Sequence, residues 1–284
     1  MARIGHFTSE AARDAYFTAY TAAMAECPEP LKTLDIETRH GTTRVYRHGV
    51  GDGPPIVLLS AMASTSAGWA DHIRGLAQRH PVYAIDALGE PGGSVQTAPI
   101  RSPAERALWL DDVLAGLDLS GVHLVGASSG GHLAVSQAIH RPDRIASVSL
   151  LDPTLVTAGF SPAVLALAVP VVAVNREWLW RRFLNWLVGP ALADGPAMRV
   201  VLAGILSYKN KLPPQFRLPA DDLRTVTLPV LAVFAGSSVA HNARKAAERA
   251  RALWPHAEVD LWADSGHHLG PGIERHVLDF IGRH

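Results

Sequence analysis

The chain has 284 residues, of which 48% are hydrophobic and 18% charged, and this composition predicts an ordered protein with a full core rather than a disordered chain. Its 26 basic and 26 acidic side chains cancel, so nothing in the overall balance points to nucleic acid, a charged membrane surface or a polyanionic partner. A small neutral substrate fits this balance better.

The first part of the chain predicts a helix followed by a β-hairpin. Residues 9–27 have helical spacing, with Ser9 as the N-cap and two prolines just beyond the end. Residues 33–48 alternate polar and apolar side chains around Gly41, as a hairpin does. Neither segment carries residues with an evident chemical role.

From residue 54 onward, short apolar segments alternate with helical ones. We expect strands at 56–60, 82–86, 122–126, 146–152, 229–235 and 257–263, and helices at 69–80, 103–117, 133–140, 242–253 and 272–282. Apolar strands separated by helices are typical of a mostly parallel sheet covered by helices on both faces. The sequence therefore predicts an α/β fold.

A long insertion interrupts this alternation after the sixth predicted strand. Residues 153–227 are helical in pattern and rich in Leu, Val and Trp, and we expect them to form a cap over the carboxyl ends of the strands. The core would then comprise residues 1–152, with the helix at 9–27 appended, and residues 228–284. We expect the cap to bind a bulky hydrophobic substrate, although packing of the cap on the core would also explain its aromatic residues. The candidate substrate-binding residues are Trp178, Phe183 and Trp186.

One short motif carries the main chemical prediction. Gly126-x-Ser128-x-Gly130 joins an apolar strand to a helical segment, and such a tight turn tolerates only small residues two positions on either side of its serine. The serine hydroxyl would be exposed at the N-terminus of the helix, where backbone N–H groups stabilise a developing anion. Ser129 is the alternative nucleophile, because it also has small neighbours, but the strand ends at Gly126 and this favours Ser128.

With these motifs in order, the chain resembles the α/β-hydrolase family over residues 54–284. The resemblance rests on the strand at 56–60, the segment Asp86-Ala87-Leu88-Gly89, the serine motif and Ser265-Gly266-His267 after the last strand. Among capped members, the chain looks most like small bacterial carboxylesterases with a similar N-terminal helix. The resemblance implies that Ser128 is the nucleophile and His267 the general base.

Two segments depart from the family pattern. Where the family usually has a His-Gly pair, this chain has Ser60-Ala61 followed by Met62, and the backbone N–H groups of Met62 and Ser129 are the expected oxyanion-hole donors.

The loop at 236–241 has Val239 where the family normally places a carboxylate. Some family members carry this acid one strand earlier. Asp152 is therefore our first candidate for the third catalytic residue, and Asp264 is the second. Asp152 could also simply terminate its strand.

The function expected from these residues is a cofactor-independent serine hydrolase. It would cleave a carboxylic ester, thioester or lactone of a bulky hydrophobic compound through an acyl-enzyme. The alternatives are a non-hydrolytic enzyme of the same fold, acting by elimination, cyclisation or a lyase step, and a catalytically silent ligand-binding protein. No sequence motif indicates a metal or a dinucleotide cofactor.

The remaining signals concern location. The first residues lack the apolar core of a signal peptide, and the most apolar run, residues 163–174, is too short to span a membrane. The single cysteine, Cys27, excludes an internal disulfide framework. We therefore expect a cytoplasmic protein without a membrane span.

Overall fold

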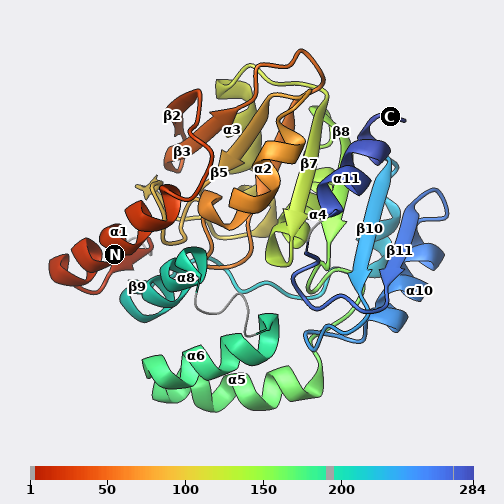
Figure 1. Ribbon diagram of the computed structural model, residues 1–284. Helices are drawn as coiled ribbons and strands as arrows, with labels where there is room; N and C mark the ends of the chain where they lie inside the picture. The colour runs from red at the N-terminus through yellow and green to blue at the C-terminus, as the bar shows by residue number, and fades with distance from the viewer. Residues whose placement is uncertain (1–3, 190–194, 271) are drawn as a thin grey trace.

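The structure is a computed structural model that describes residues 4–189, 195–270 and 272–284. Its centre is a twisted sheet with the spatial strand order β11-β10-β8-β7-β4-β5-β3-β2 (Figure 1). The strands from β11 to β5 are parallel, whereas β3 runs antiparallel to β5 and to β2. The strands are β2 (Lys32–Thr38), β3 (Gly41–His48), β4 (Ile56–Leu59), β5 (Val82–Ile85), β7 (Val122–Ala127), β8 (Ile145–Leu151), β10 (Val230–Ala235) and β11 (Glu258–Trp262).

Helices cover both faces of this sheet (Figure 1). Apolar side chains of α3, α4 and α10 pack on one face, and those of α1, α2 and α11 pack on the other. Every residue of β4, β5 and β10 is buried, which explains why these strands are continuous apolar runs in the sequence. These helices are α1 (Glu10–Met24), α2 (Ala70–Leu76), α3 (Pro103–Gly116), α4 (Ser129–His140), α10 (Ala243–Leu253) and α11 (Ile273–Ile281). The predicted α/β fold is confirmed.

The structure differs from the sequence expectation in a few short elements. The helix expected at 69–80 begins earlier, as the 3-10 helix η1 (Ser66–Trp69), because the side chain of Thr65 accepts a hydrogen bond from the N–H of Ala67. Three strands of two residues each were not expected from the sequence, namely β1 (His6–Phe7), β6 (Val95–Gln96) and β9 (Tyr208–Lys209). Two residues are too few to show a strand periodicity.

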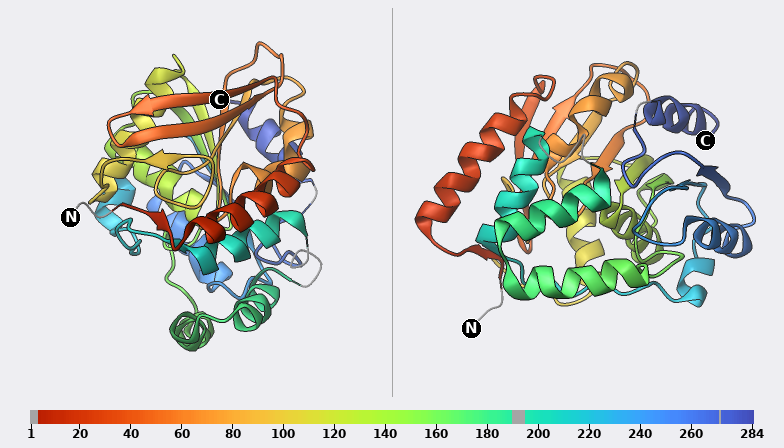
Figure 2. Two further views of the ribbon diagram at one scale, coloured as in Figure 1. Left: turned by 90° about the vertical axis from the view of Figure 1, so that its left-hand side faces the viewer. Right: turned by 60° about the horizontal axis from the view of Figure 1, so that its bottom comes forward.

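The insertion at 153–227 follows β8. It contains α5 (Pro162–Val174), α6 (Glu177–Val188), α8 (Pro196–Ser207), β9 (Tyr208–Lys209) and α9 (Ala220–Arg224). Helices α5 and α6 lie side by side beyond the carboxyl ends of the parallel strands (Figures 1 and 2).

The N-terminal segment is joined to the insertion as well as to the core. Strand β1 pairs with β9 in antiparallel fashion, and α1 packs against α8 (Figure 2). On its other side, α1 reaches the core through Tyr20, whose hydroxyl donates to Asp86 at 2.6 Å. The helix expected as an appendage of the core therefore contacts both the core and the insertion.

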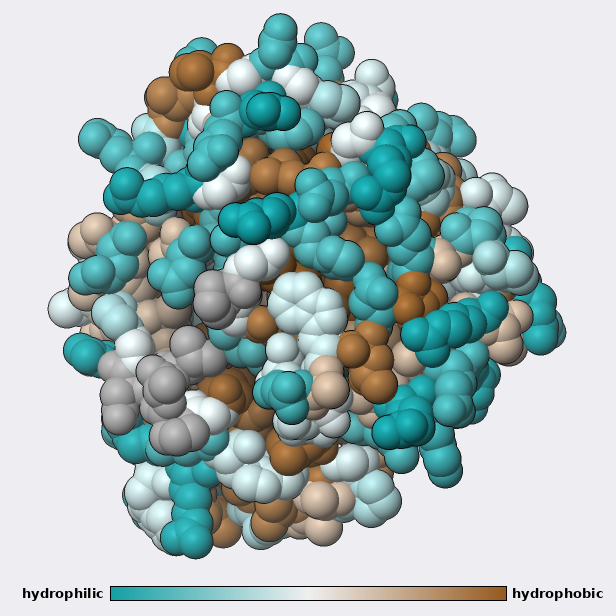
Figure 3. Space-filling view, turned by 45° about the vertical axis from the view of Figure 1, so that its right-hand side comes forward, coloured by the Kyte–Doolittle hydropathy of each residue, from teal (hydrophilic) through white to brown (hydrophobic). Residues whose placement is uncertain are grey.

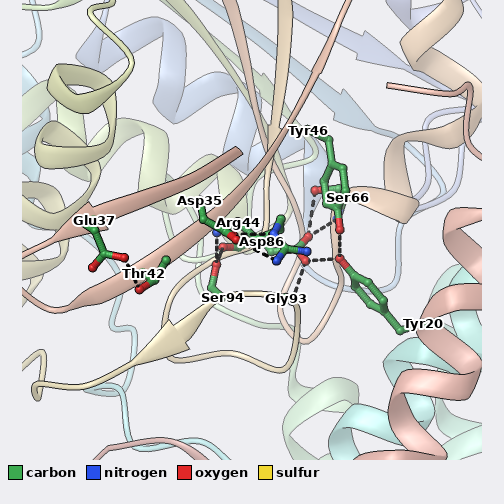
Figure 4. Close-up of polar contacts among 10 residues, drawn as sticks. All are labelled: Tyr20, Asp35, Glu37, Thr42, Arg44, Tyr46, Ser66, Asp86, Gly93 and Ser94. Carbon is green, nitrogen blue, oxygen red and sulfur yellow. Dashed lines mark hydrogen bonds and ion pairs between the residues drawn. The ribbon is translucent and has the colours of Figure 1, made fainter. Parts of the chain in front are cut away.

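Asp86 connects several segments at the carboxyl end of β5 (Figure 4). Its buried carboxylate accepts hydrogen bonds from the Tyr20 hydroxyl, from the N–H and hydroxyl of Ser66 at 2.8 Å each, and from the N–H of Gly93 at 2.8 Å. The Tyr20 hydroxyl also lies 2.6 Å from that of Tyr46. A buried carboxylate needs several donors to offset its lost hydration, and here those donors tie α1 and η1 to the sheet.

Candidate active site

Ser128 lies at the sharp turn between β7 and α4. Its backbone has φ 52° and ψ −115°, a conformation that L-residues rarely adopt and that costs roughly 1–3 kcal/mol. A Cβ atom at Gly126 would collide with the backbone of Gly130, and one at Gly130 would collide with the carbonyl of Leu59. The glycines on either side are therefore required by close backbone contacts.

The two serines of the motif occupy different positions. Ser128 is the residue before the helix, and Ser129 is the first residue of α4. The N–H of Ser129 consequently belongs to the unpaired donors at the helix N-terminus.

His267 lies in the loop after β11 and contacts Ser128. Its Nε2 atom is 3.0 Å from the Ser128 hydroxyl oxygen, and its Nδ1 atom is 2.6 Å from Oδ2 of Asp152. The hydroxyl of Ser238 lies farther from Nδ1, at 3.5 Å. The structure thus brings Ser128, His267 and Asp152 together in one hydrogen-bonded series, although 115 residues separate His267 from Asp152.

Asp152 is the first residue after β8, and its side chain is fully buried. Its Oδ1 atom accepts a hydrogen bond from the N–H of Ala235 at 3.0 Å, and Nε2 of His241 lies 3.2 Å from the same oxygen. Burial alone would raise the pKa of the Asp152 carboxyl, but the neighbouring imidazoles of His241 and His267 outweigh it and hold that pKa well below its usual range. Asp152 is therefore ionised at neutral pH.

The second acid candidate is placed differently. Asp264 is exposed, and the Nδ1 atom of His267 is directed to Asp152 instead. In the loop where the family usually has its acid, the carbonyl of Val239 accepts a hydrogen bond from the hydroxyl of Ser161, the N-cap of α5. This loop thus anchors the start of α5.

The loop after β4 contains Met62 and passes the N-terminus of α4. The carbonyls of Leu59 and Ser60 lie so close to Gly130 that no Cβ would fit there. Met62 itself is 63% exposed, and the next residue, Ala63, has a positive φ of 58°. The two expected oxyanion donors thus come from neighbouring backbone segments.

A buried ion pair supports this loop. Glu90 accepts a hydrogen bond from the N–H of Ala63 at 2.7 Å and pairs with Arg106 at 2.8 Å. Both charged side chains are nearly buried, so the contact with Ala63 is held from behind by a charge-assisted interaction.

The three aromatic residues proposed for substrate binding all lie on α6. Phe183 and Trp186 are half-buried, with ring centroids 5.9 Å apart, and Trp180 contacts Phe183 edge-on. Trp178 is separate from them and 64% exposed. It lines a cavity of about 500 Å³. The described residues that line this cavity all belong to α6, namely Glu177, Trp178, Arg181, Arg182 and Asn185. Ser128, His267 and Asp152 are not among them.

Two contacts that support the site were not expected from the sequence. His241 lies two positions after Val239, in a loop where only a carboxylate was expected, and a histidine has no sequence signal for approaching a distant aspartate. Glu90 follows Gly89 in a family motif, yet nothing local relates it to Ala63.

Metal sites and membrane spans are both lacking in the part of the chain that the structure describes. Among residues 4–189, 195–270 and 272–284, no group of three or more His, Cys, Asp or Glu side chains could hold a metal ion. Within the same ranges, no helix has the length and apolar character needed to cross a bilayer.

Comparison with known proteins relates this geometry to a family. The sequence profile of the alpha/beta hydrolase family matches residues 56–279. The chain belongs to this family. The match includes the Ser128 turn, Asp152 and the His267 loop.

The chain is similar to several bacterial hydrolases along nearly its whole length. It is 24% identical to carboxylesterase YbfK of Bacillus subtilis, over 94% of this chain and 93% of the relative. The crystal structure of that carboxylesterase superposes with a TM-score of 0.88 at 23% identity, covering 96% of this chain and 99% of the other. The crystal structure of naproxen esterase from Bacillus subtilis superposes with a TM-score of 0.85 at 25% identity, covering 93% and 96%.

Proposed function

We propose that the protein is a serine hydrolase that cleaves carboxylic esters, thioesters or lactones through an acyl-enzyme. The observation that carries this proposal is the series of short contacts from Ser128 through His267 to Asp152. A nucleophile, a base and a residue that orients the base are what acyl transfer to a serine requires. The similarity to proteins named carboxylesterase supports the same reaction.

Ser128 and His267 carry out the bond-making steps of the proposed mechanism. The Ser128 hydroxyl oxygen attacks the carbonyl carbon while His267 Nε2 accepts its proton. The oxyanion accepts hydrogen bonds from the N–H groups of Met62 and Ser129. His267 then returns the proton to the leaving alkoxide or thiolate, and a water molecule, deprotonated by the same imidazole, hydrolyses the acyl-enzyme.

Asp152 has an electrostatic role in this mechanism. Its carboxylate holds the proton of His267 on Nδ1, so that Nε2 is free to act as the base, and it stabilises the imidazolium that forms. Its full burial makes this stabilisation stronger than it would be in water.

For the substrate, we propose an ester with a bulky hydrophobic acyl group. The half-buried Phe183 and Trp186 on α6 and the exposed Met62 beside the Ser128 turn support this. One structural neighbour is named a naproxen esterase, which is consistent with the same preference.

Labelling with a fluorophosphonate probe tests the covalent mechanism. We expect the probe to label the wild type and not Ser128→Ala. Ser129→Ala is the matched control, because it removes the neighbouring hydroxyl but keeps the backbone N–H, and it should still be labelled. Labelling of Ser128→Ala would exclude Ser128 as the nucleophile, and a wild type that is not labelled would favour a non-hydrolytic or ligand-binding role.

A further inference from the structure

Helix α5 is apolar on every side, yet most of it is exposed. Its thirteen residues are only Ala, Leu, Val and Pro. Only three residues of the helix are not exposed, namely Val164, Ala168 and Val171. Their spacing places them in one narrow stripe along the helix, which packs against α6. Large side chains elsewhere on α5 are 45–70% exposed, namely Leu165, Leu167, Val169, Val172 and Val174.

This helix lies at an outer end of the molecule. Figures 1 and 2 show α5 beyond the sheet with the core on one side of it only. In Figure 3, hydrophobic side chains lie among pale and hydrophilic ones at the lower end of the molecule, where α5 and α6 lie. A contiguous exposed apolar surface on a globular protein marks a contact with another apolar surface.

Positive charge borders the apolar helix. Across residues 162–188, the charged residues are three arginines and one glutamate, although the whole chain has no net charge. Arg176 and Arg182 are both exposed, and Trp178 is 64% exposed. Arginine and tryptophan beside an exposed aliphatic helix are typical of segments that lie in the headgroup region of a bilayer.

We propose that α5 docks the insertion onto a lipid surface that contains anionic headgroups. The helix would lie in the plane of the surface, with Leu167, Val169 and Val172 among the acyl chains and with Arg176 and Arg182 at the headgroups. This mode does not require a membrane span. Although the whole chain has no net charge, residues 162–188 carry a net positive charge, which would favour an anionic surface.

The size of α5 argues against a second copy of this chain as the occupant. A helix of thirteen residues is about 20 Å long and about 10 Å across, so the surface of its exposed half is about 300 Å². A stable protein–protein interface buries about 800 Å² on each partner. A lipid surface has no such minimum, because it can surround the helix.

Docking would place a lipid surface on the side of the sheet where Ser128 and His267 lie. The carboxyl ends of the parallel strands, which carry these residues, face α5 and α6 (Figure 1). A substrate dissolved in lipid would then reach the site without crossing bulk water. The docking does not itself depend on the proposed catalytic activity.

Co-sedimentation of the full chain with sucrose-loaded vesicles tests this proposal. We expect binding to vesicles of phosphatidylcholine mixed with phosphatidylglycerol, and weaker binding at high salt. The double variant Val169→Glu/Val172→Glu should bind at least about tenfold more weakly, because it places charges on the inserted face. Arg182→Gln should bind about fivefold more weakly, the factor for about 1 kcal/mol per basic residue at an anionic surface.

Val50→Glu is the matched control. Val50 is 85% exposed in the loop between β3 and β4, at the opposite end of the sheet from α5, so this variant should bind like the wild type. Circular dichroism and turnover of a water-soluble short-chain ester show whether each variant is folded. The absence of binding to these vesicles would overturn the proposal, as would equal binding by the folded double variant. A dimer in analytical ultracentrifugation that Val169→Glu dissociates, together with no vesicle binding, would identify a second copy as the occupant instead.

Discussion

Asp152 combines full burial, two neighbouring imidazoles and a left-handed backbone conformation. Its φ is 41°, and the oxygen that does not contact His267 accepts the N–H of Ala235 and lies near His241. A residue in such a conformation persists only where its surroundings hold it. Here both carboxylate oxygens have partners, so the position of the carboxylate relative to His267 is tightly constrained.

Replacing Asp152 with asparagine tests its proposed role. Asp152→Asn has nearly the same shape, but it cannot stabilise the imidazolium or hold the productive tautomer of His267. We expect kcat to fall by about ten-thousandfold with the fold intact. Asp264→Asn is the control, because Asp264 is exposed, and it should change kcat little. Comparable losses in the two variants would argue against Asp152 as the orienting residue.

A second residue-scale prediction concerns His241. Its side chain is 1% exposed and contacts Asp152 and the ring of Phe234. His241→Phe keeps a ring of similar size and removes the polar atom next to the carboxylate. We expect kcat to fall by about tenfold, the effect of losing a polar contact to a charged carboxylate of about 1.5 kcal/mol, while KM stays unchanged. A rise in KM with unchanged kcat would instead assign His241 to substrate binding. Steady-state kinetics distinguishes the two outcomes.

At the scale of elements, strand β7 carries a buried histidine in the centre of the sheet. His123 is 1% exposed, and its Nδ1 atom lies 2.7 Å from the hydroxyl of Ser147 in β8. Burial, with smaller contributions from His80 and His284, lowers the pKa of His123 to about 4. The folded protein therefore favours the neutral form of this imidazole.

This burial predicts a pH dependence of stability. Below about pH 6.5, the unfolded chain binds a proton at His123 that the folded chain excludes, so the free energy of unfolding falls as the pH falls. The loss reaches roughly 3 kcal/mol at pH 4, at about 1.4 kcal/mol per pH unit. Urea unfolding of the wild type and of His123→Leu between these two pH values measures this loss in the free energy of unfolding. The variant should show a shallower slope, although burial also lowers the pKa of His48, His132 and His268. Parallel slopes would contradict the assignment.

For the whole molecule, the position of the insertion over the strand ends bears on substrate preference. A series of p-nitrophenyl esters of increasing acyl length measures this substrate preference. If the acyl chain is buried among apolar side chains, kcat/KM should rise by up to about fourfold for each CH₂ group, the factor for about 0.8 kcal/mol. Ser128→Ala supplies the background rate. Highest turnover on the acetate ester would contradict a large apolar site.

Local sequence was sufficient for the alternation of strands and helices and for the two motifs that contain Ser128 and His267. The reason is that their signals are short-range: a buried parallel strand is a continuous apolar run, and a sharp strand-to-helix turn excludes side chains within two residues of its serine. The confirmed α/β fold therefore follows from patterns that each span fewer than about twenty residues.

The partners of these residues depended on long-range packing. Asp152 reaches His267 because β8 lies beside β10 in a register that pairs Leu151 with Val233, and this register also brings the N–H of Ala235 to the carboxylate. No sequence pattern relates Asp152 to His241, or α1 to α8, because these contacts join segments far apart in the chain. Only the order and register of the strands selected Asp152 over Asp264 as the neighbour of His267.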